Sequence, residues 1–301
     1  MGINTETAAF LCEARAGGAS FARVLTLGRQ NLNVDRAALR ALGERHGFMA
    51  AEADAAHDEY CEPFFTRFLG SVNVEAVDNS GYEGASLVHD LNVPVPAEWE
   101  QRYDAVVDGG TLEHVFNFPV ALANCMRMTR TGGRLYVFTP ANNQLGHGFY
   151  QFSPELFYRT LAREHGFEIE EMVAVQFRFA STECGSTGQA YRVADPAQVG
   201  SRITLVNSRP ITLMIRARKV EHQASPFATI PQQSDYSHIW ETGDGDSTPP
   251  PRAVTRSALR SPARMVKRLL PPALGERLRN EYDRRFVHSL RNRAFYTPTR
   301  N

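Results

Sequence analysis

Long apolar runs are missing from this chain of 301 residues. No stretch of about eighteen consecutive apolar residues could cross a membrane, and the first residues lack the basic start and apolar run of a secretory signal peptide. We therefore expect a protein of the cytoplasm. The 43% hydrophobic content is still enough to build the core of a large globular domain.

Cysteine is scarce as well. The four cysteines, Cys12, Cys61, Cys125 and Cys184, lie far apart and form no C-x-x-C pair. This spacing argues against a structural zinc site and against a disulfide framework. We expect reduced, mostly buried thiols and no bound metal.

The chain carries no net charge overall, but its charged residues are distributed unevenly along the sequence. Residues 252–301 contain thirteen Arg or Lys and three acidic residues, so the rest of the chain carries the compensating negative charge. Within this basic tail, apolar residues at every fourth position predict an amphipathic helix: Leu274, Leu278, Tyr282, Phe286 and Leu290. The preceding Pro/Ser-rich residues 221–256 have the composition of a flexible linker. We therefore predict a domain over residues 1–220, a linker over 221–256 and a helical tail over 257–301.

Strand and helix patterns alternate through the first part of the chain. The predicted helices begin or end at capping residues such as Asp35, Ser153 and Gly166. Alternation of this kind predicts a doubly wound α/β fold with a mostly parallel sheet. The predicted strands are Arg23–Leu27, Val72–Asp78, Ala85–Asn92, Ala105–Val107, Gly132–Asn143, Phe167–Val175 and Pro210–Arg218.

Three consecutive strands end in an acid: Asp78, Asp90 and Asp108. Ligands of open parallel sheets bind at the carboxyl ends of the strands, so these acids mark the predicted site. Asp is also favoured in turns and helix caps, which is the alternative explanation for each of them taken alone.

The segments YDAVVDGGTLEHV (Tyr103–Val115) and GGRLYVFTPANN (Gly132–Asn143) resemble the fourth and fifth strands of class I S-adenosylmethionine-dependent methyltransferases. The resemblance covers about residues 20–220. It implies a Rossmann-like, mostly parallel seven-stranded sheet with helices on both faces, in which the last strand, Pro210–Arg218, is inserted antiparallel. It also implies S-adenosylmethionine as the cofactor and transfer of its methyl group to oxygen or nitrogen of a small molecule, such as a glycan precursor or a secondary metabolite.

The resemblance assigns the cofactor contacts residue by residue. Asp78, with Asn79 beside it, would accept the ribose hydroxyls. Asp90 would accept from the adenine amino group, and the backbone of Leu91 would read a ring nitrogen. Asp108, Gly109 and Gly110 would line the pocket beside the methionine end and the sulfonium. We expect the three carboxylates to converge around the cofactor.

The first strand departs from the family pattern. Class I methyltransferases usually carry an acid and then G-x-G-x-G after this strand, whereas this chain reads VLTLGRQNLNVD, in which only Gly28 matches. Arg29 and Gln30 stand where small residues are expected. Either Arg29 holds the methionine carboxylate in an altered but working loop, or the domain has lost its cofactor and is a non-catalytic binding or scaffold protein. The length between Gly28 and Asp78 predicts more than one helix there.

Candidate catalytic residues follow the fourth and fifth strands. A hydroxyl acceptor must lose a proton, for which Glu113, His114 and His147 are the candidates. The EHV text at Glu113 resembles that of ubiquinone-type O-methyltransferases. Adjacent helical residues point about 100° apart, so we expect one of this pair to be structural. A metal held by Glu113, His114 and a third carboxylate has no support from ligand spacing.

Residues after the fifth strand are predicted to form the substrate rim: Asn142, Asn143, Tyr150 and Phe152. Their amide and aromatic groups suit a small polar molecule, although aromatic residues here are often packing. The basic tail suggests contact with the acidic body, with a protein partner or with an anionic membrane surface. We rank these above nucleic acid, but a nucleic-acid methyltransferase guided by the tail stays a third functional reading.

Overall fold

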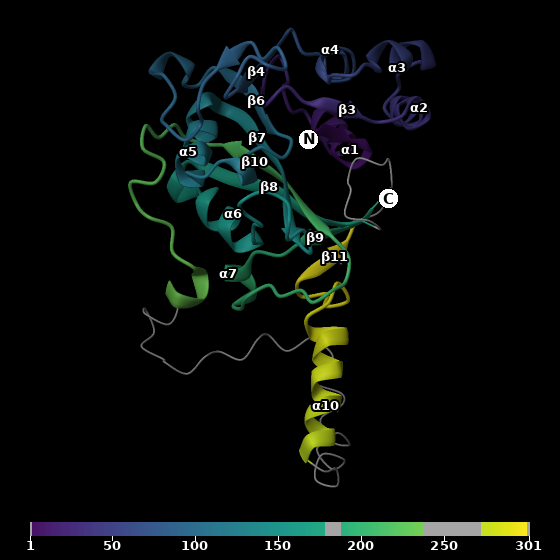
Figure 1. Cartoon of the computed structure of the whole chain (residues 1–301), viewed down its shortest axis with the longest axis vertical. Coiled ribbons are helices and arrows are strands. Elements are labelled where there is room, and N and C mark those ends of the chain that lie inside the picture. Colours follow the sequence, from purple (N-terminus) through teal and green to yellow (C-terminus); the bar gives the residue numbers. More distant parts are fainter. Residues whose placement is uncertain (1, 178–187, 238–271, 300–301) are drawn as a thin grey trace.

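The computed structural model describes residues 2–177, 188–237 and 272–299 (Figure 1). Among them, no helix has the length and apolar character needed to cross a membrane. The predicted linker from residue 238 onward and the tail up to residue 271 lie outside the described residues.

The strands are β1 Gly2–Asn4, β2 Arg23–Leu27, β3 Asn31–Asn33, β4 Asn73–Asp78, β5 Leu87–Val88, β6 Tyr103–Asp108, β7 Thr129–Asn142, β8 Phe167–Gln176, β9 Gln189–Val193, β10 Ile211–Lys219 and β11 Tyr296–Pro298. The helices are α1 Thr5–Ala16, α2 Arg36–Arg45, α3 Ala50–Ala56, α4 Glu62–Phe68, α5 Phe118–Met128, α6 Pro154–Thr160, α7 Pro196–Val199 and α10 Pro272–Tyr282, with short 3-10 turns at η1 Ala97–Trp99, η2 Leu112–His114 and η3 Arg163–His165.

The main sheet runs in the order β11-β9-β8-β10-β7-β6-β2-β4-β5. Strands β7, β6, β2, β4 and β5 pair in parallel, and β10 lies antiparallel between β7 and β8. The inserted antiparallel strand confirms the predicted arrangement. The predicted count of seven was wrong for the described residues, because β9 and β11 extend the sheet beyond β8 to nine strands. The strand predicted over Ala85–Asn92 is reduced to the two residues of β5.

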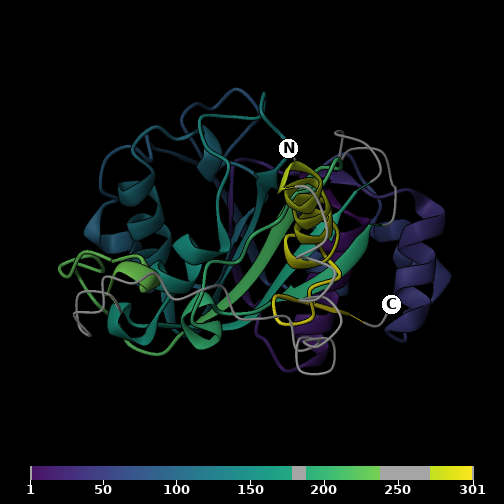
Figure 2. The same cartoon turned by 90° about the horizontal axis from the view of Figure 1, so that it is seen from below.

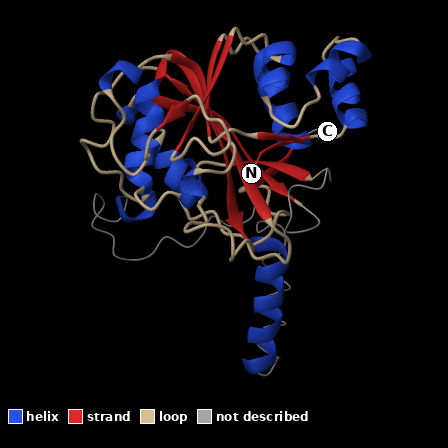
Figure 3. Cartoon of the chain, turned by 45° about the horizontal axis from the view of Figure 1, so that its top comes forward, coloured by secondary structure: helices blue, strands red, loops and turns tan. Residues whose placement is uncertain are grey.

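Both faces of the sheet are covered by helices (Figures 1 and 3). Side chains alternate along each strand, so neighbouring residues of β6 enter different cores. Val106 packs with the residues of α5 and α6, whereas Ala105 and Val107 pack with those of α1, α2 and α4. Burial on both faces explains why the parallel strands are apolar at nearly every position. The polar residues of this fold are thereby concentrated at the strand ends.

Helices α2, α3 and α4 fill the long segment between β2 and β4, as the spacing predicts. Asp35 caps α2 through a hydrogen bond from Ala38 N at 2.8 Å, also as predicted. The chain leaves β2 through residues 28–30 and enters β3, which pairs in parallel with β1 in a separate small sheet. An extended segment therefore follows the first loop, where the family pattern leads into a helix.

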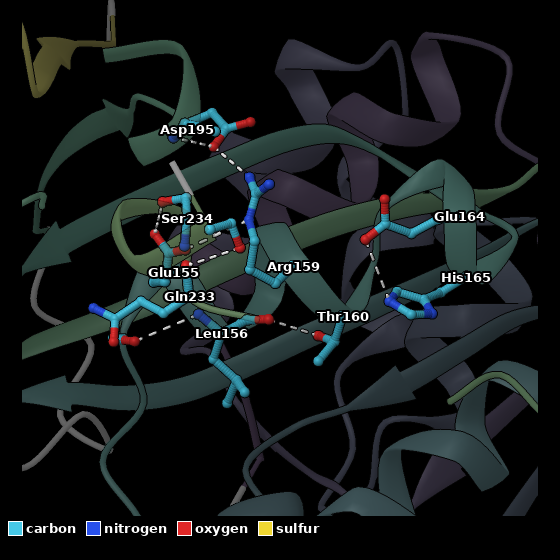
Figure 4. A network of polar contacts seen from close by, with 12 residues as sticks. Glu155, Leu156, Arg159, Thr160, Glu164, His165, Asp195, Gln233 and Ser234 are labelled. Atoms are coloured by element: carbon cyan, nitrogen blue, oxygen red, sulfur yellow. Dashed lines mark hydrogen bonds and ion pairs between the residues drawn. The ribbon is translucent and has the colours of Figure 1, made fainter. Parts of the chain in front are cut away.

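The first part of the predicted linker is packed against the body. Glu155 of α6 accepts hydrogen bonds from Ser234 N at 2.7 Å and Ser234 Oγ at 3.1 Å (Figure 4). Arg159 on the same helix pairs with Asp195 at the start of α7, at 2.6 Å. His165 Nδ1 lies 2.7 Å from Pro226 O. Residues of the 221–237 segment thus pack against the folded body, and the division into a domain, a linker and a tail stays a prediction.

The tail is helical over α10 and the following π-turn Asp283–Val287, as the four-residue spacing predicts. Figure 1 shows α10 standing away from the sheet, and in Figure 2, seen from below, the helix lies in front of the strands. The last described residues return to the body, where β11 pairs with β9 and Phe295 and Tyr296 are buried. Within the described residues, β11 is thus an edge strand of the main sheet.

Candidate active site at the carboxyl edge of the sheet

The loop after β2 brings Gly28 against the end of β4. Gly28 N donates to Val77 O at 2.7 Å, which continues the parallel pairing one residue past the strand. Gly28 has φ of +70°, a conformation that favours glycine. A Cβ at this position would lie 3.5 Å from Thr111 Oγ1 and 3.7 Å from Asp78 Oδ2. The ends of three neighbouring strands therefore meet at Gly28.

Asp78 stands at this meeting point with its carboxylate half-buried. Its backbone oxygen accepts from His89 N at 2.8 Å, and Oδ1 accepts a long hydrogen bond of 3.4 Å from Ser80 N. The neighbouring Asn79 is exposed. Asp78 thus offers carboxylate oxygens at the place where a ribose diol is expected.

Asp90 and Asp108 are placed differently. Asp90 is exposed, and the backbone and side chain of Asn92 donate to its Oδ1 at 2.9 and 2.8 Å, which holds the pKa of Asp90 below its usual range. Leu91 beside it is buried. The carboxylate of Asp90 therefore accepts hydrogen bonds within its own turn. This is the alternative role, an acid that stabilises a turn, that the sequence left open for it.

Asp108 is fully buried beneath the turn that follows β6. Its Oδ1 accepts from the backbone of Gly110, Thr111 and Leu112, the shortest bond being 2.7 Å from Thr111 N. Burial, together with the nearby Glu113 carboxylate, raises the pKa of Asp108 well above its usual range. Strand β2 lies between Asp78 and Asp108, which places these strand ends about 10 Å apart. The three carboxylates therefore make separate contacts in this structure, and their convergence around a cofactor stays a prediction.

Gln30 fills the space between the first loop and Gly109. Its side chain is 2% exposed and donates from Nε2 to Leu27 O, while Oε1 is buried with no hydrogen-bond partner among the described residues. A Cβ on Gly109 would lie 2.7 Å from Gln30 Cδ, so only glycine admits this packing. At Gly110 the chain adopts φ of +100°. The predicted methionine pocket beside Gly109 is thus occupied by Gln30 in this structure.

Arg29 is engaged on the outer side of the same loop. Its Nε lies 2.6 Å from Glu62 Oε1, Nη1 donates to Glu83 O at 3.1 Å, and the guanidinium lies 3.8 Å from the centre of the Tyr60 ring. Holding a methionine carboxylate would require this guanidinium to be shared with Glu62. That role of Arg29 stays a prediction.

Glu113, His114 and His147 come together at the other end of this edge. His147 Nε2 lies 3.3 Å from Glu113 Oε1, and the His114 and His147 ring centres are 5.3 Å apart. The carboxylate and imidazole ligand atoms of the three residues all lie within 4.8 Å of one another. Glu113 is 1% exposed, whereas His114 is exposed and the His147 side chain is 40% exposed. Glu113 and His114, neighbours in the 3-10 turn η2, both lie beside His147, and which of the two has only a structural role stays a prediction.

The loop after β7 is held on the backbone of Glu113. Phe149 N and Tyr150 N donate to Glu113 O at 2.8 and 3.3 Å. Gly148 has φ of +74°, and a Cβ there would lie 2.8 Å from Glu113 O. Close approach of the two backbones therefore requires glycine, and it places His147 beside the Glu113 carboxylate.

The predicted substrate rim is mostly structural. Asn142 and Asn143 donate to Asn207 Oδ1 at 2.8 and 2.6 Å, which ties β7 to the 205–209 segment. Phe152 is buried in the core against α5, so its assignment to an open rim was wrong. Tyr150 donates to Phe116 O at 2.6 Å and stacks on Phe152.

Sequence reasoning missed the exposed aromatic pair beside the histidines. Phe116 and Phe149 are 72% and 67% exposed and meet edge to face at 5.8 Å. The positions of these residues next to His114 and His147 in the chain could have indicated them. It also missed Glu62 and Tyr60 as partners of Arg29, for which no local pattern exists.

Comparison with known proteins finds no family model and no curated protein that matches this chain. Solved structures do resemble it. An S-adenosylmethionine-dependent methyltransferase from Thermotoga maritima is 15% identical, with a TM-score of 0.38, 72% of this chain covered and 91% of the other. A 1,6-didemethyltoxoflavin-N1-methyltransferase from Burkholderia thailandensis, with 1,6-didemethyltoxoflavin and S-adenosylhomocysteine bound, is 16% identical, with a TM-score of 0.35, 72% of this chain covered and 78% of the other. A branched-chain polyamine synthase from Thermus thermophilus is 13% identical, with a TM-score of 0.35 and 78% and 63% covered.

These likenesses carry no conclusion about the activity of this chain. The fold itself is that of the class I methyltransferases, because the described sheet has the parallel strands, the antiparallel insertion of β10 between β7 and β8, and the two helical layers of that fold. Function must be argued from the carboxyl edge.

Proposed function

We propose that this protein transfers the methyl group of S-adenosylmethionine to an oxygen or nitrogen of a small molecule, such as a glycan precursor or a secondary metabolite. The observation that carries the proposal is the meeting of Gly28 and Asp78 at the ends of two neighbouring parallel strands. A left-handed glycine lets a ligand approach the backbone, and a half-buried carboxylate beside it suits a ribose diol.

The first loop also offers an acceptor for the methionine end. Gln30 Oε1 is buried without a hydrogen-bond partner among the described residues, which is costly for a polar atom. A ligand ammonium would satisfy it. Because the Gln30 side chain now lies on Gly109, it must turn for the ligand to enter, and Gly109 and Gly110 leave the backbone room for that movement.

Methyl transfer requires alignment more than acid-base chemistry. A lone pair of the acceptor attacks the methyl carbon, the carbon–sulfur bond breaks, and its electron pair stays on sulfur as S-adenosylhomocysteine leaves. Where the acceptor is a hydroxyl, its proton must also leave. His147 is placed to receive that proton, and the buried Glu113 carboxylate 3.3 Å away stabilises the imidazolium that forms.

The acceptor side favours a small molecule with an apolar or planar part. Phe116 and Phe149 expose an aromatic surface next to His114 and His147. Exposed aromatic rings are favoured contacts for planar ligands. The helix α10 with its following π-turn does not itself strengthen the nucleic-acid reading, because over residues 272–287 four arginines face three acidic residues.

The test is calorimetric titration of the full chain with S-adenosylhomocysteine. We expect saturable binding, and we expect Asp78→Asn to weaken it about 10- to 100-fold, because a hydrogen bond to a charged group contributes about 1.5–3 kcal/mol. Asp283→Asn in the tail is the matched control and should bind as the unchanged protein does. Binding that is indifferent to Asp78→Asn would overturn the assignment of the ribose contact.

A second candidate is a binding or scaffold protein that has lost the cofactor. Two observations favour it: Gln30 packs on Gly109, and Arg29 is paired with Glu62. A ligand that binds only the folded state must raise its melting temperature. No rise with millimolar S-adenosylmethionine or S-adenosylhomocysteine would favour the scaffold over the enzyme.

A further inference from the structure

We propose that Glu113, His114 and His147 form a binding site for one divalent transition-metal ion. The site is built by two adjacent residues of η2 and one residue of the loop after β7. Its ligand atoms, one carboxylate oxygen and two imidazole nitrogens, lie within 4.8 Å of one another. The inference concerns ion binding itself and holds whether or not methyl transfer is the activity of the protein.

The geometry at Glu113 points to a cation. The Glu113 side chain is 1% exposed, and its Oε1 has no hydrogen-bond partner among the described residues, although His147 Nε2 is 3.3 Å away. Two ligands bound at about 2.1 Å to one ion are separated by roughly 3.0–3.4 Å, so this pair already has the spacing of shared coordination. His114 needs only a small movement to complete the set.

A second buried carboxyl group lies behind the turn that carries Glu113. Asp108 is fully buried, its Oδ1 accepts from Leu112 N next to Glu113 in the chain, and its Oδ2 lacks a hydrogen-bond partner among the described residues. Ionising a carboxyl group is costly in such a buried environment, and a divalent ion bound to Glu113 would favour its charged form.

The protein supports the three side chains from behind. Thr139 Oγ1 donates to Glu113 Oε2 at 3.4 Å, which leaves Oε1 directed toward the histidines. Phe149 N and Tyr150 N hold the Glu113 backbone, and Gly148 packs directly on it. Such outer contacts orient metal ligands and raise their affinity.

The ligand set selects the kind of ion. Two imidazoles and one carboxylate suit Zn²⁺, Mn²⁺, Co²⁺ or Fe²⁺, whereas Mg²⁺ and Ca²⁺ prefer oxygen ligands alone. Because His114 is exposed and the His147 side chain is 40% exposed, further coordination positions face solvent. These positions can take water or an oxygen atom of a bound small molecule. With the ion present, His147 is a ligand and no longer accepts a proton.

The test is titration of tag-free, chelator-treated full-length protein with Co²⁺, followed by calorimetry and by visible absorption of the bound ion. We expect one ion per chain, with no comparable binding of Mg²⁺ or Ca²⁺. His114→Gln, a change at the surface, should weaken Co²⁺ binding about 100-fold or more. His57→Gln at the end of α3 is the matched control and should leave binding unchanged.

Each outcome decides the proposal. A single site lost in both His114→Gln and His147→Gln supports it. Absence of stoichiometric Co²⁺ binding, or binding that persists in both variants, overturns it. Titration of the same samples with S-adenosylhomocysteine keeps the two proposals apart, because the nucleoside site at Asp78 shares no ligand with the metal site.

Discussion

Two loops of the carboxyl edge, residues 28–30 after β2 and residues 143–152 after β7, have opposite character. In the first loop, Arg29 is paired with Glu62, and Gln30 is buried against Gly109. In the second loop, His147 and Phe149 are substantially exposed. The first loop, on the proposed cofactor side, is thus closed by its own side chains, while the second loop, on the proposed acceptor side, exposes its side chains to solvent.

The difference between the two loops indicates which of them must move when a ligand binds. The second loop is rigidly placed by the backbone of Glu113, so an acceptor or an ion meets groups that are already assembled. The first loop must release Gln30 before the methionine end of a cofactor can enter. We therefore expect a slow or weak first step at the cofactor side and a prepared acceptor side.

The largest effect is expected from a change in the exposed loop of residues 143–152. In metal-free protein, His147→Ala should lower the rate of methyl transfer to a hydroxyl acceptor by about 10²–10⁴-fold, the usual contribution of a proton-accepting side chain. S-adenosylhomocysteine affinity should not change, because Asp78 and Gly28 are untouched. The rate is followed by release of S-adenosylhomocysteine with a panel of sugar and phenol acceptors.

His89→Ala is the control for that experiment, since His89 contacts Trp99 beyond the third strand. An unchanged hydroxyl methylation rate in His147→Ala would show that the acceptor does not react beside the loop of residues 143–152.

Gly148→Ala should break the backbone contact with Glu113 that holds the loop of residues 143–152 in place. The new Cβ would lie 2.8 Å from Glu113 O in a left-handed backbone conformation. We expect a loss of about 2–3 kcal/mol in the free energy of unfolding, measured with urea, and a displaced His147. Gly200→Ala has φ of +69° with nothing within 4 Å, so it should lose only about 1 kcal/mol. Equal losses in both variants would mean that the loop is not held by Glu113.

Titration of the Cys61 thiol reports whether solvent reaches the space beside the loop of residues 28–30. Cys61 is buried beside the first loop, its N donating to Gln30 O at 2.9 Å, and burial raises the pKa of its thiol. The thiol of the unfolded chain ionises near pH 8.5 and that of the folded chain only at much higher pH. Its contribution to stability is therefore complete below about pH 8.5 and is lost as the pH rises above that value.

Between pH 7 and pH 10 this one thiol should lower the free energy of unfolding by about 2 kcal/mol. The Cys61→Ala variant lacks that contribution, so its stability should fall by correspondingly less over the same range. Parallel pH curves for the two proteins would show that the closed side admits solvent to the thiol.

The smallest effect is expected at the ion pair of Arg29 and Glu62, whose side chains are each 32% exposed. Glu62→Gln should change the free energy of unfolding by less than about 1 kcal/mol, as for other exposed pairs. Because it releases the Arg29 guanidinium, it should tighten S-adenosylhomocysteine binding by about 2- to 5-fold, equivalent to less than 1 kcal/mol. Adenosine, which has no carboxylate, should bind both proteins equally. Equal gains for the two ligands would remove Arg29 from the cofactor site.

The strands and helices that could be predicted are those whose patterns are local. The apolar strands β2, β4 and β6 and the caps at Asp35 and Ser153 depend on residues close in the sequence, and the structure confirms them. Strand β11 could not be predicted, because only its pairing with the distant β9 makes it a strand. The packed segment around Ser234 likewise depends on Glu155, which lies far away in the chain.

For the candidate site, the sequence indicated residues that lie at the carboxyl edge of the sheet, but not their contacts. The spacing of Glu113 and His147 could not show that a backbone contact at Gly148 would bring them to 3.3 Å. Nor could the departure from the glycine pattern show that Gln30 packs on Gly109. Both facts depend on how two loops meet in space, which residue type and periodicity do not encode.

The decisive measurement is a crystal structure of the full chain with S-adenosylhomocysteine. We expect the ribose hydroxyls within hydrogen-bond distance of the Asp78 carboxylate, with the methionine end beside Gly28 and the Gln30 side chain turned away from Gly109. A nucleoside bound elsewhere, or a Gln30 that stays on Gly109 in crystals soaked at saturating ligand, would contradict it.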